Sequence, residues 1–310
     1  MIAGIGPLQI MLERGESKDW FEATEIKVEA IVAFFSLVAF TWHELVTDHP
    51  VVDLRILRNR QLASGVVFGL ILGFALYASV FALPVFLQSN LGYTAWDTGK
   101  VILPGAIASA VTMAITGRIT GKMDARWLIV TGVGLFFWAM WLHYHFTLDI
   151  GMSDTVFPMI LRGVGLGLIF VPLTQVAVAD LKPQQLAQGT GLFNLSRQLG
   201  GSFGIAVAAT LLQRFTEQSR EALRAHLNLA EPVTANWVAA VTARMQQLGG
   251  NLETARQRTY ALLDFKLHQQ ASVIAFEKVF LVMGVTFVLA LPLLLAFRTG
   301  RTQGGGGAAH

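Results

Sequence analysis

Long apolar segments separated by short polar stretches make up most of the chain. Seven of these segments are close to the roughly 20 residues that an α-helix needs to cross a bilayer at about 1.5 Å rise per residue. They cover residues 28–42, 62–87, 98–116, 127–146, 158–179, 186–212 and 273–297. The pattern therefore predicts an all-α, polytopic membrane protein with seven transmembrane helices.

One long polar region, residues 213–272, separates the last two predicted spans. We expect helices at 214–227 and 233–248, and Asn251 can cap a third helix that continues into the final span. Four apolar residues recur on one face of the second helix: Trp237, Val241, Met245 and Leu248. This face indicates either packing on neighbouring helices and the membrane interface, or a docking surface for a partner protein.

Composition supports a membrane location. Of the 310 residues, 54% are hydrophobic and 14% are charged, against about 45–50% and about 25% in soluble domains. The net charge of +3 and the pI near 9.3 come from basic residues that are scattered over the loops, so we expect no nucleic acid partner. The absence of cysteine excludes disulfides and thiolate sites.

Lysine and arginine lie mainly in the loops on one side of the predicted membrane, and the loops at 88–97 and 148–155 on the other side contain none. Because basic loops face the cytoplasm, we expect a cytoplasmic C-terminus. The predicted order is an extracytoplasmic opening segment (1–27), an inserted helix (28–42), a cytoplasmic connector (43–61), five bundle helices (62–212), an extracytoplasmic amphipathic helical region (213–272), a last helix (273–297) and a cytoplasmic Gly-rich tail (298–310).

Two arginines, Arg162 and Arg197, lie well inside the fifth and sixth predicted spans. A guanidinium among lipid tails costs at least about 2.5–3.5 kcal/mol, so both side chains should face protein or water. We interpret the surroundings as a water-accessible cavity. Each arginine either contacts an anionic proton site or polar substrate group, or binds helix carbonyls or a neighbouring domain as a structural pair.

Other polar and aromatic residues in the spans are weaker candidates for the same cavity. Asn194, Gln198 and Gln175 either face a substrate path or form hydrogen bonds between helices. Tyr77, Phe81 and Phe193 either stack on an aromatic compound or pack in the helix bundle.

Small residues and prolines mark the expected helix contacts and bends, because missing side chains let backbones approach each other. These candidates for packing or hinge positions are Gly65, Gly69, Gly73, Pro84, Pro104, Gly163, Gly165, Gly167, Pro172, Gly200, Gly201 and Gly204.

Several ordered motifs resemble one family of transporters. They are Leu83-Pro84-Val85-Phe86-Leu87-Gln88, Leu91-Gly92-Tyr93-Thr94-Ala95, Leu103-Pro104-Gly105, Arg162-Gly163 with Pro172-Leu173, Asn194 with Arg197 and Leu199-Gly200-Gly201-Ser202, and, before the bundle, Leu8-Gln9-Ile10-Met11-Leu12-Glu13-Arg14-Gly15 and Pro50-Val51-Val52-Asp53-Leu54. The set is similar to the second half of the 14-span drug:proton antiporters of the major facilitator superfamily, in the EmrB/QacA branch.

The resemblance implies a rocker-switch exporter in which two six-helix bundles enclose a central cavity. The chain would hold one inserted helix and the C-terminal bundle, lacking the N-terminal bundle, and would not transport alone. The energy source implied is the proton gradient, with no cofactor, and the substrates are hydrophobic or amphipathic small molecules. A periplasmic membrane-fusion adaptor and an outer-membrane duct are the implied partners besides the lipid bilayer. The second, third, fifth and sixth spans would line the cavity.

A loop at 117–126 resembles a cytoplasmic motif of the same superfamily. The resemblance implies a charge latch that stabilises one conformation, whereas the simpler interpretation is a basic cytoplasmic loop. The latch candidates are Gly117, Arg118, Gly121, Asp124 and Arg126.

Patterns typical of enzymes are incomplete. His43-Glu44-Leu45-Val46-Thr47 has threonine where a zinc protease needs its second histidine. His143, His145 and Asp149 lie among tryptophan and tyrosine residues that are typical of a membrane interface, so we interpret them as part of an aromatic belt rather than a metal site. We therefore predict a transporter or, as the alternative, a non-transporting membrane module that binds a partner, and no enzyme.

Overall fold

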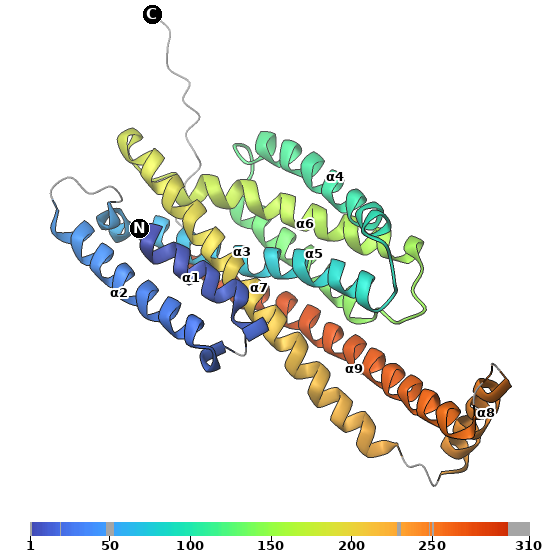
Figure 1. The fold of residues 1–310 in the computed structure, drawn as a ribbon. Helices are drawn as coiled ribbons and strands as arrows, with labels where there is room; N and C mark the ends of the chain where they lie inside the picture. The colour runs from blue at the N-terminus through green and yellow to red at the C-terminus, as the bar shows by residue number, and fades with distance from the viewer. Residues whose placement is uncertain are drawn as a thin grey trace, which may run out of the picture.

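The computed structural model describes residues 2–18, 20–47, 53–227, 231–247, 249 and 251–296. These residues form an all-α fold without a strand in the described ranges (Figure 1). The α-helices are α1 (Ile2–Arg14), α2 (Thr24–Val46), α3 (Arg60–Ser89), α4 (Ala95–Ile119), α5 (Ala125–Tyr144), α6 (Met152–Val178), α7 (Leu186–His226), α8 (Pro232–Gln247) and α9 (Leu252–Ala290). Short 3-10 helices lie at Glu16–Lys18, Trp20–Glu22, Leu54–Arg58, Pro183–Gln185 and Leu291–Ala296.

Within the described ranges, six helices are long and apolar enough to cross a membrane: α2, α3, α4, α5, α6 and α9 with its 3-10 extension. This agrees with a polytopic membrane protein. The sixth predicted span lies in α7, which is longer than the others but carries Asn194, Arg197 and Gln198 in its first half. These side chains lower the mean hydropathy of α7, so the count of seven stays a prediction.

Side-chain caps explain where several helices begin. Asn59 accepts hydrogen bonds from the backbone N–H groups that open α3, and Thr94 does the same for α4. Asp124 caps α5, and Asn251 caps α9 through the N–H of Thr254. Such caps satisfy backbone donors that have no partner within the helix, so the helices begin at these polar residues rather than at the first apolar one.

The bundle consists of α3 to α7 and α9, with α3 lying along α7 and α4 along α6. Glycines allow the backbones of these pairs to touch. A Cβ at Gly73 of α3 would overlap the carbonyl oxygen of Arg197 in α7, and one at Gly163 of α6 would overlap the carbonyl of Gly105 in α4. The helices of each pair therefore approach more closely than a side chain at Gly73 or Gly163 would permit.

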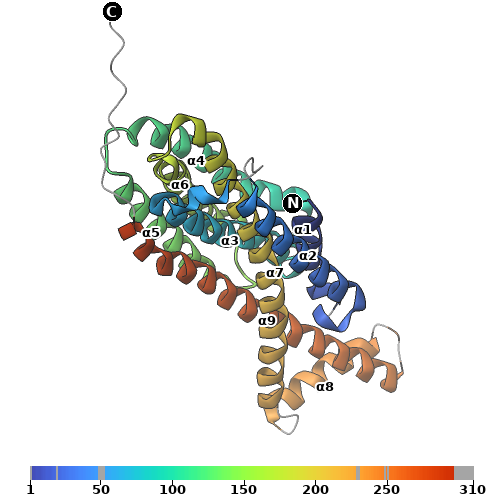
Figure 2. The same cartoon turned by 90° about the vertical axis from the view of Figure 1, so that its left-hand side faces the viewer.

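Helices α1 and α2 lie beside the bundle, where α1 contacts both α2 and α7 (Figures 1 and 2). The segment that joins them is attached to α7 by Trp20, whose Nε1 donates to Thr210 Oγ1 at 3.2 Å. Trp20 has a φ of +52°, which a non-glycine residue adopts only when its surroundings hold it there. Its ring packs against Gly15, where a Cβ would meet the indole at 2.6 Å.

Helices α7 and α9 continue past the bundle as a pair, with α8 at their far end (Figures 1 and 2). We call residues 213–226, α8 and residues 252–272 the arm. Arg220 of α7 contacts both carboxylate oxygens of Asp264 in α9, at 2.6 and 2.8 Å. Thr242 of α8 donates to Thr259 of α9 at 3.1 Å. The arm is thus tied together by polar contacts on both sides of α9.

The apolar face predicted for residues 233–248 packs mainly within the arm. Trp237, Val241 and Met245 are half-buried on α8, which lies against α9, and the fourth residue of that face, Leu248, lies outside the described residues. The Gly-rich tail and the Pro50-Val51-Val52 motif also lie outside them. The described residues of the predicted face are therefore partly covered.

Candidate functional site around Arg197

Arg162 is buried in the bundle between α6 and α3. Its side chain is 7% exposed, and Nη1 donates to the backbone carbonyl of Ser79 at 3.4 Å. Ser79 itself is fully buried and donates its hydroxyl to the carbonyl of Leu76. Arg162 thus contacts the backbone of a neighbouring helix, which matches the structural alternative for this residue.

Arg197 lies in a cluster of three helices. Its Nη1 donates to the Tyr77 hydroxyl of α3 at 3.1 Å. The guanidinium carbon lies 5.8 Å from the centroid of the Tyr77 ring and 5.5 Å from that of Phe170 in α6. Arginine is attracted to the faces of aromatic rings, so both rings stabilise its charge. We call Arg197, Tyr77 and Phe170 the Arg197 cluster.

The glycines of α3 and α7 place this cluster. Gly73 lets α3 reach the backbone of Arg197 itself, and Gly201 lies under the Tyr77 ring one turn further along α7. A side chain at either position would push the helices apart and separate the arginine from the tyrosine. The glycine pattern that was predicted to mark helix packing therefore also sets the geometry of the cluster.

The charge of Arg197 has no carboxylate partner within the ranges that the structure describes. The ion pairs found there are Lys18–Glu25, Lys100–Asp97 and Arg220–Asp264. The Nε atom of Arg197 is buried and makes no hydrogen bond to any residue that the structure describes. The cluster consequently combines a positive charge, an unused donor and two aromatic rings, on a side chain that is only partly buried.

Other predicted cavity residues differ in their surroundings. Asn194 and Gln198 are exposed on α7 on either side of Arg197, and Gln175 is exposed near the end of α6. None of these three side chains forms a hydrogen bond in the described part of the chain, so they do not tie helices together there. Phe81 is partly buried and packs against the bundle core.

The candidate role of Phe193 in a cavity is wrong for this structure. Phe193 is fully buried, and its ring faces Gly69 of α3, where a Cβ would meet it at 2.9 Å. The residue fills the contact between α3 and α7. In contrast, Phe170 was not predicted, because nothing in the sequence distinguishes it from the other apolar residues of α6.

The loop with the latch candidates contains a helix cap and no ion pair between its described residues. Asp124 accepts a hydrogen bond from the backbone N–H of Arg126 at 3.0 Å. Arg118 is exposed, and a Cβ at Gly121 would meet nothing within 4 Å. The observed role of Asp124 is thus to begin α5.

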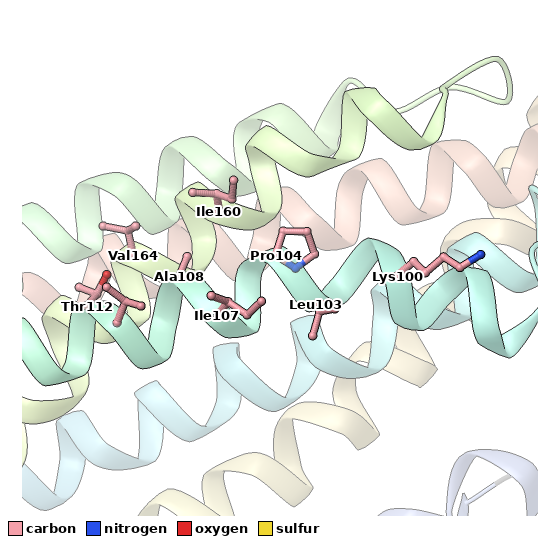
Figure 3. A pocket seen from close by; sticks show the side chains of 9 residues that line it. Lys100, Leu103, Pro104, Ile107, Ala108, Thr112, Ile160 and Val164 are labelled. Atoms are coloured by element: carbon pink, nitrogen blue, oxygen red, sulfur yellow. The ribbon is translucent and has the colours of Figure 1, made fainter.

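A long hollow of about 600 Å³ lies on the surface of α4 and α6 (Figure 3). Its walls are almost entirely apolar, and Lys100 lies at one end, where it pairs with Asp97 at 3.2 Å. The lining residues are Lys100, Leu103, Pro104, Ile107, Ala108, Val111, Thr112, Ile160 and Val164. The hollow can accommodate an apolar chain but offers few polar contacts.

His143 is not interfacial as predicted. It is fully buried in the bundle, where Nδ1 lies 2.6 Å from the Ala139 carbonyl and the ring packs against Phe146 and Phe280. His145 is exposed and packs on Trp141. The described residues contain no group of three potential ligands that could hold a metal ion.

Comparison with known proteins gives the family. Residues 9–205 match the family model described as Major Facilitator Superfamily. The chain is 31% identical over 310 residues to the fatty acid resistance protein FarB of Neisseria gonorrhoeae, covering 99% of this chain and 59% of that protein. It is 30% identical over 313 residues to the multidrug export protein EmrB of Escherichia coli (strain K12), covering 100% of this chain and 59% of that protein.

A solved structure shows a similar fold. A bacterial homologue of the human lysosomal transporter Spinster, in an inward-facing and occupied conformation, aligns with a TM-score of 0.50 at 16% identity, covering 89% of this chain and 58% of that one. The chain thus spans about three fifths of the length of the relatives that it matches. These relatives are transport proteins rather than enzymes, in agreement with the prediction from the sequence. This chain forms a helical membrane bundle and matches the family model over residues 9–205, so it belongs to the Major Facilitator Superfamily.

Proposed function

We propose that the chain forms the C-terminal part of an exporter for hydrophobic or amphipathic compounds, which works by alternating access and uses the proton gradient. The Arg197 cluster carries this proposal, because it places an unpaired charge and two aromatic rings on three helices of the bundle. A charged group beside aromatic rings is an arrangement that suits amphipathic compounds. The names of the relatives, which refer to multidrug export and fatty acid resistance, support the same class of substrate.

Proton coupling belongs to the same proposal. The resemblance to drug:proton antiporters places the coupling carboxylates largely in the other half of those transporters, so the chain would supply part of the cavity and its helix contacts. The proposed orientation has a cytoplasmic C-terminus, based on the basic loops. A reporter enzyme that folds only outside the cytoplasm, fused after His310, should be inactive. An active reporter would reverse the orientation.

Uptake into inverted membrane vesicles tests the exporter. Vesicles that contain the chain joined to the N-terminal bundle that the resemblance implies, and that are energised by respiration, should accumulate the uncharged dye N-phenyl-1-naphthylamine, and collapse of the proton gradient by a protonophore should release it. A variant with Arg214→Gln, an exposed change on α7 outside the Arg197 cluster, should behave like the unchanged protein. Equal dye uptake with and without the gradient would reject proton coupling, and no uptake by correctly folded protein would reject export.

A second candidate, a membrane module that binds a partner, is favoured by exposed aromatic residues on the arm. Tyr260 and Phe265 of α9 are 47% and 61% exposed. We propose that the arm lies outside the cytoplasm and docks a periplasmic membrane-fusion adaptor that leads to an outer-membrane duct. Trp237 and Met245 are less suitable test positions than the exposed pair, because both are half-buried against α9 and changing them would disturb the arm itself.

Pull-down of the adaptor from membranes tests this docking. Replacing Tyr260 and Phe265 by serine should lower adaptor recovery without changing the amount of inserted protein. Gln257→Ser on the same helix, also exposed, is the matched control. Unchanged adaptor recovery at equal expression would mean that the arm is not the dock.

A further inference from the structure

We propose that the Arg197 cluster binds the anionic head of an amphipathic substrate and thereby makes the site selective for anionic over cationic amphiphiles. This inference rests on the proposed export function and gives it a substrate class, a carboxylate or similar oxyanion on an apolar tail.

The guanidinium has one edge that is not used. Nη1 is occupied by the Tyr77 hydroxyl, while Nε and Nη2 make no hydrogen bond to any described residue. Nη2 is the remaining donor that a ligand can approach, because the Nε atom is buried. A guanidinium binds oxyanions through charge-assisted hydrogen bonds, so an oxyanion that accepts from Nη2 would neutralise a charge that has no carboxylate partner in the described residues.

The surroundings select an amphiphile rather than a small ion. The rings of Tyr77 and Phe170 hold the guanidinium from two helices and offer apolar faces next to it. Exposed amides at Asn194 and Gln198 flank the arginine along α7 and can contact polar atoms of the head. An ammonium head would meet the like charge of Arg197, so cationic compounds should bind less well.

Two other cations in the predicted spans, Arg162 and Lys100, do not offer the same arrangement. Arg162 is directed to the Ser79 carbonyl and is 7% exposed, so a ligand has little access to it. Lys100 already pairs with Asp97, whose carboxylate would repel an anionic head beside it. Arg197 is therefore the best placed of these three side chains to receive an anion.

Binding of matched probes tests the proposal. The protein in phosphatidylcholine nanodiscs is titrated with laurate and with dodecyltrimethylammonium, which share a twelve-carbon tail, and binding to empty nanodiscs is subtracted. Hydrogen bonds to a charged group predict that Arg197→Gln raises the Kd for laurate by about 10- to 100-fold. The same variant should leave the Kd for dodecyltrimethylammonium unchanged or lower it. Arg197→Lys keeps the charge without the guanidinium and should give an intermediate Kd for laurate.

Controls separate the proposal from loss of fold. Arg214→Gln removes an exposed arginine from the same helix and should leave both affinities unchanged. Size-exclusion profiles and melting temperatures of the variants show whether the bundle is intact. An intact Arg197→Gln variant that binds laurate as tightly as the unchanged protein overturns the proposal. If that variant does not fold, the proposal is overturned when Arg197→Lys binds laurate with the same affinity as the unchanged protein.

Two further outcomes are distinguishable. If phosphatidylglycerol in the nanodiscs displaces laurate from the unchanged protein but not from Arg197→Lys, the occupant is a lipid head group and the assignment to a substrate is wrong. If laurate affinity is insensitive to Arg197 while vesicles still export the uncharged dye N-phenyl-1-naphthylamine, the substrate class fails and the export function stands. Laurate binding that depends on Arg197 in a protein without vesicle transport supports the site and rejects the export function.

Discussion

Arg162 and Arg197 occupy neighbouring helices of one bundle, yet the structure gives them different surroundings. Arg162 on α6 is almost completely buried and donates to the backbone carbonyl of Ser79. Arg197 on α7 is partly buried and is held by the side chains of Tyr77 and Phe170. In the sequence both residues are costly charges in apolar helices, and in the structure the two charges are stabilised by different partners.

The difference between the partners indicates a difference in function. A backbone carbonyl inside a helix is a fixed acceptor, and a ligand cannot take its place without disturbing α3. Aromatic rings stabilise a cation without using its hydrogen-bond donors, so an arginine between rings remains able to bind an anion. We therefore expect changes at Arg162 to affect the bundle and changes at Arg197 to affect binding.

The largest effect is expected from a change that removes the geometry of the Arg197 cluster. Gly73→Ala places a methyl group on the carbonyl oxygen of Arg197, so α3 and α7 have to separate. Overpacking of this kind costs about 1–3 kcal/mol, and contact with rigid backbone predicts the upper end of that range. The melting temperature in detergent should fall clearly.

Gly191→Ala is the control for this change, because a Cβ at Gly191 of α7 would meet nothing within 4 Å. Alanine favours a helix over glycine by about 0.8–1 kcal/mol, so the control should be neutral or slightly stabilising. Equal melting temperatures for the two variants would show that α3 and α7 are not in backbone contact in the membrane.

The second prediction compares how accessible positions 162 and 197 are to water. The chain contains no cysteine, so a single one can be introduced at either position without background. A cysteine replacing Arg197 should react with a water-soluble thiol reagent about ten times faster, or more, than one replacing Arg162, because reactivity follows exposure. Cysteines replacing Asn194 and Phe193 give the exposed and buried reference rates. Equal rates at 162 and 197 would remove the distinction between the arginines.

The sequence predicted the positions of the membrane helices well, because apolar length is a strong signal. It placed their ends less well. The third span was predicted at 98–116, whereas α4 runs from Ala95 to Ile119, because Thr94 caps it and its first turn is polar. The sequence predicted a span at 186–212 and a separate helix at 214–227, whereas α7 continues through both to His226, and Arg220 near its end pairs with Asp264 of α9.

The sequence also identified both members of the hydrogen bond between Arg197 and Tyr77, but not the bond itself. These residues are 120 positions apart, and only the packing of α3 on α7 brings them together. The sequence could not show which of Phe193 and Phe170 contacts Arg197. Both are aromatic residues in apolar helices, and which of them faces the arginine depends on how the helices are rotated, which hydropathy does not determine.

A smaller effect is expected from Tyr77→Phe, which removes the hydroxyl that accepts the hydrogen bond of Arg197 and leaves the ring in place. One hydrogen bond to a charged group contributes about 1.5–3 kcal/mol when it is buried, and less here because Arg197 is partly exposed. We expect a modest decrease in the melting temperature. Ser79→Ala is the comparison at Arg162, and it should leave that hydrogen bond intact because the acceptor is the backbone carbonyl. A larger decrease for Ser79→Ala than for Tyr77→Phe would contradict the assigned partners.

The smallest effect is expected from a third arginine, Arg220, which pairs with Asp264 across the arm. The side chains of Arg220 and Asp264 are 40% and 57% exposed, so water and salt weaken their attraction and the pair contributes little to stability. Arg220→Ala should lower the melting temperature slightly at low salt, and the difference from the unchanged protein should disappear at high salt. Arg197→Gln should change little between the same two salt concentrations, since its charge lies among aromatic rings. If the effect of Arg220→Ala were large and independent of salt, the pair would be shielded from solvent by a partner on the arm, and the ranking of the three arginines by access to water would be wrong.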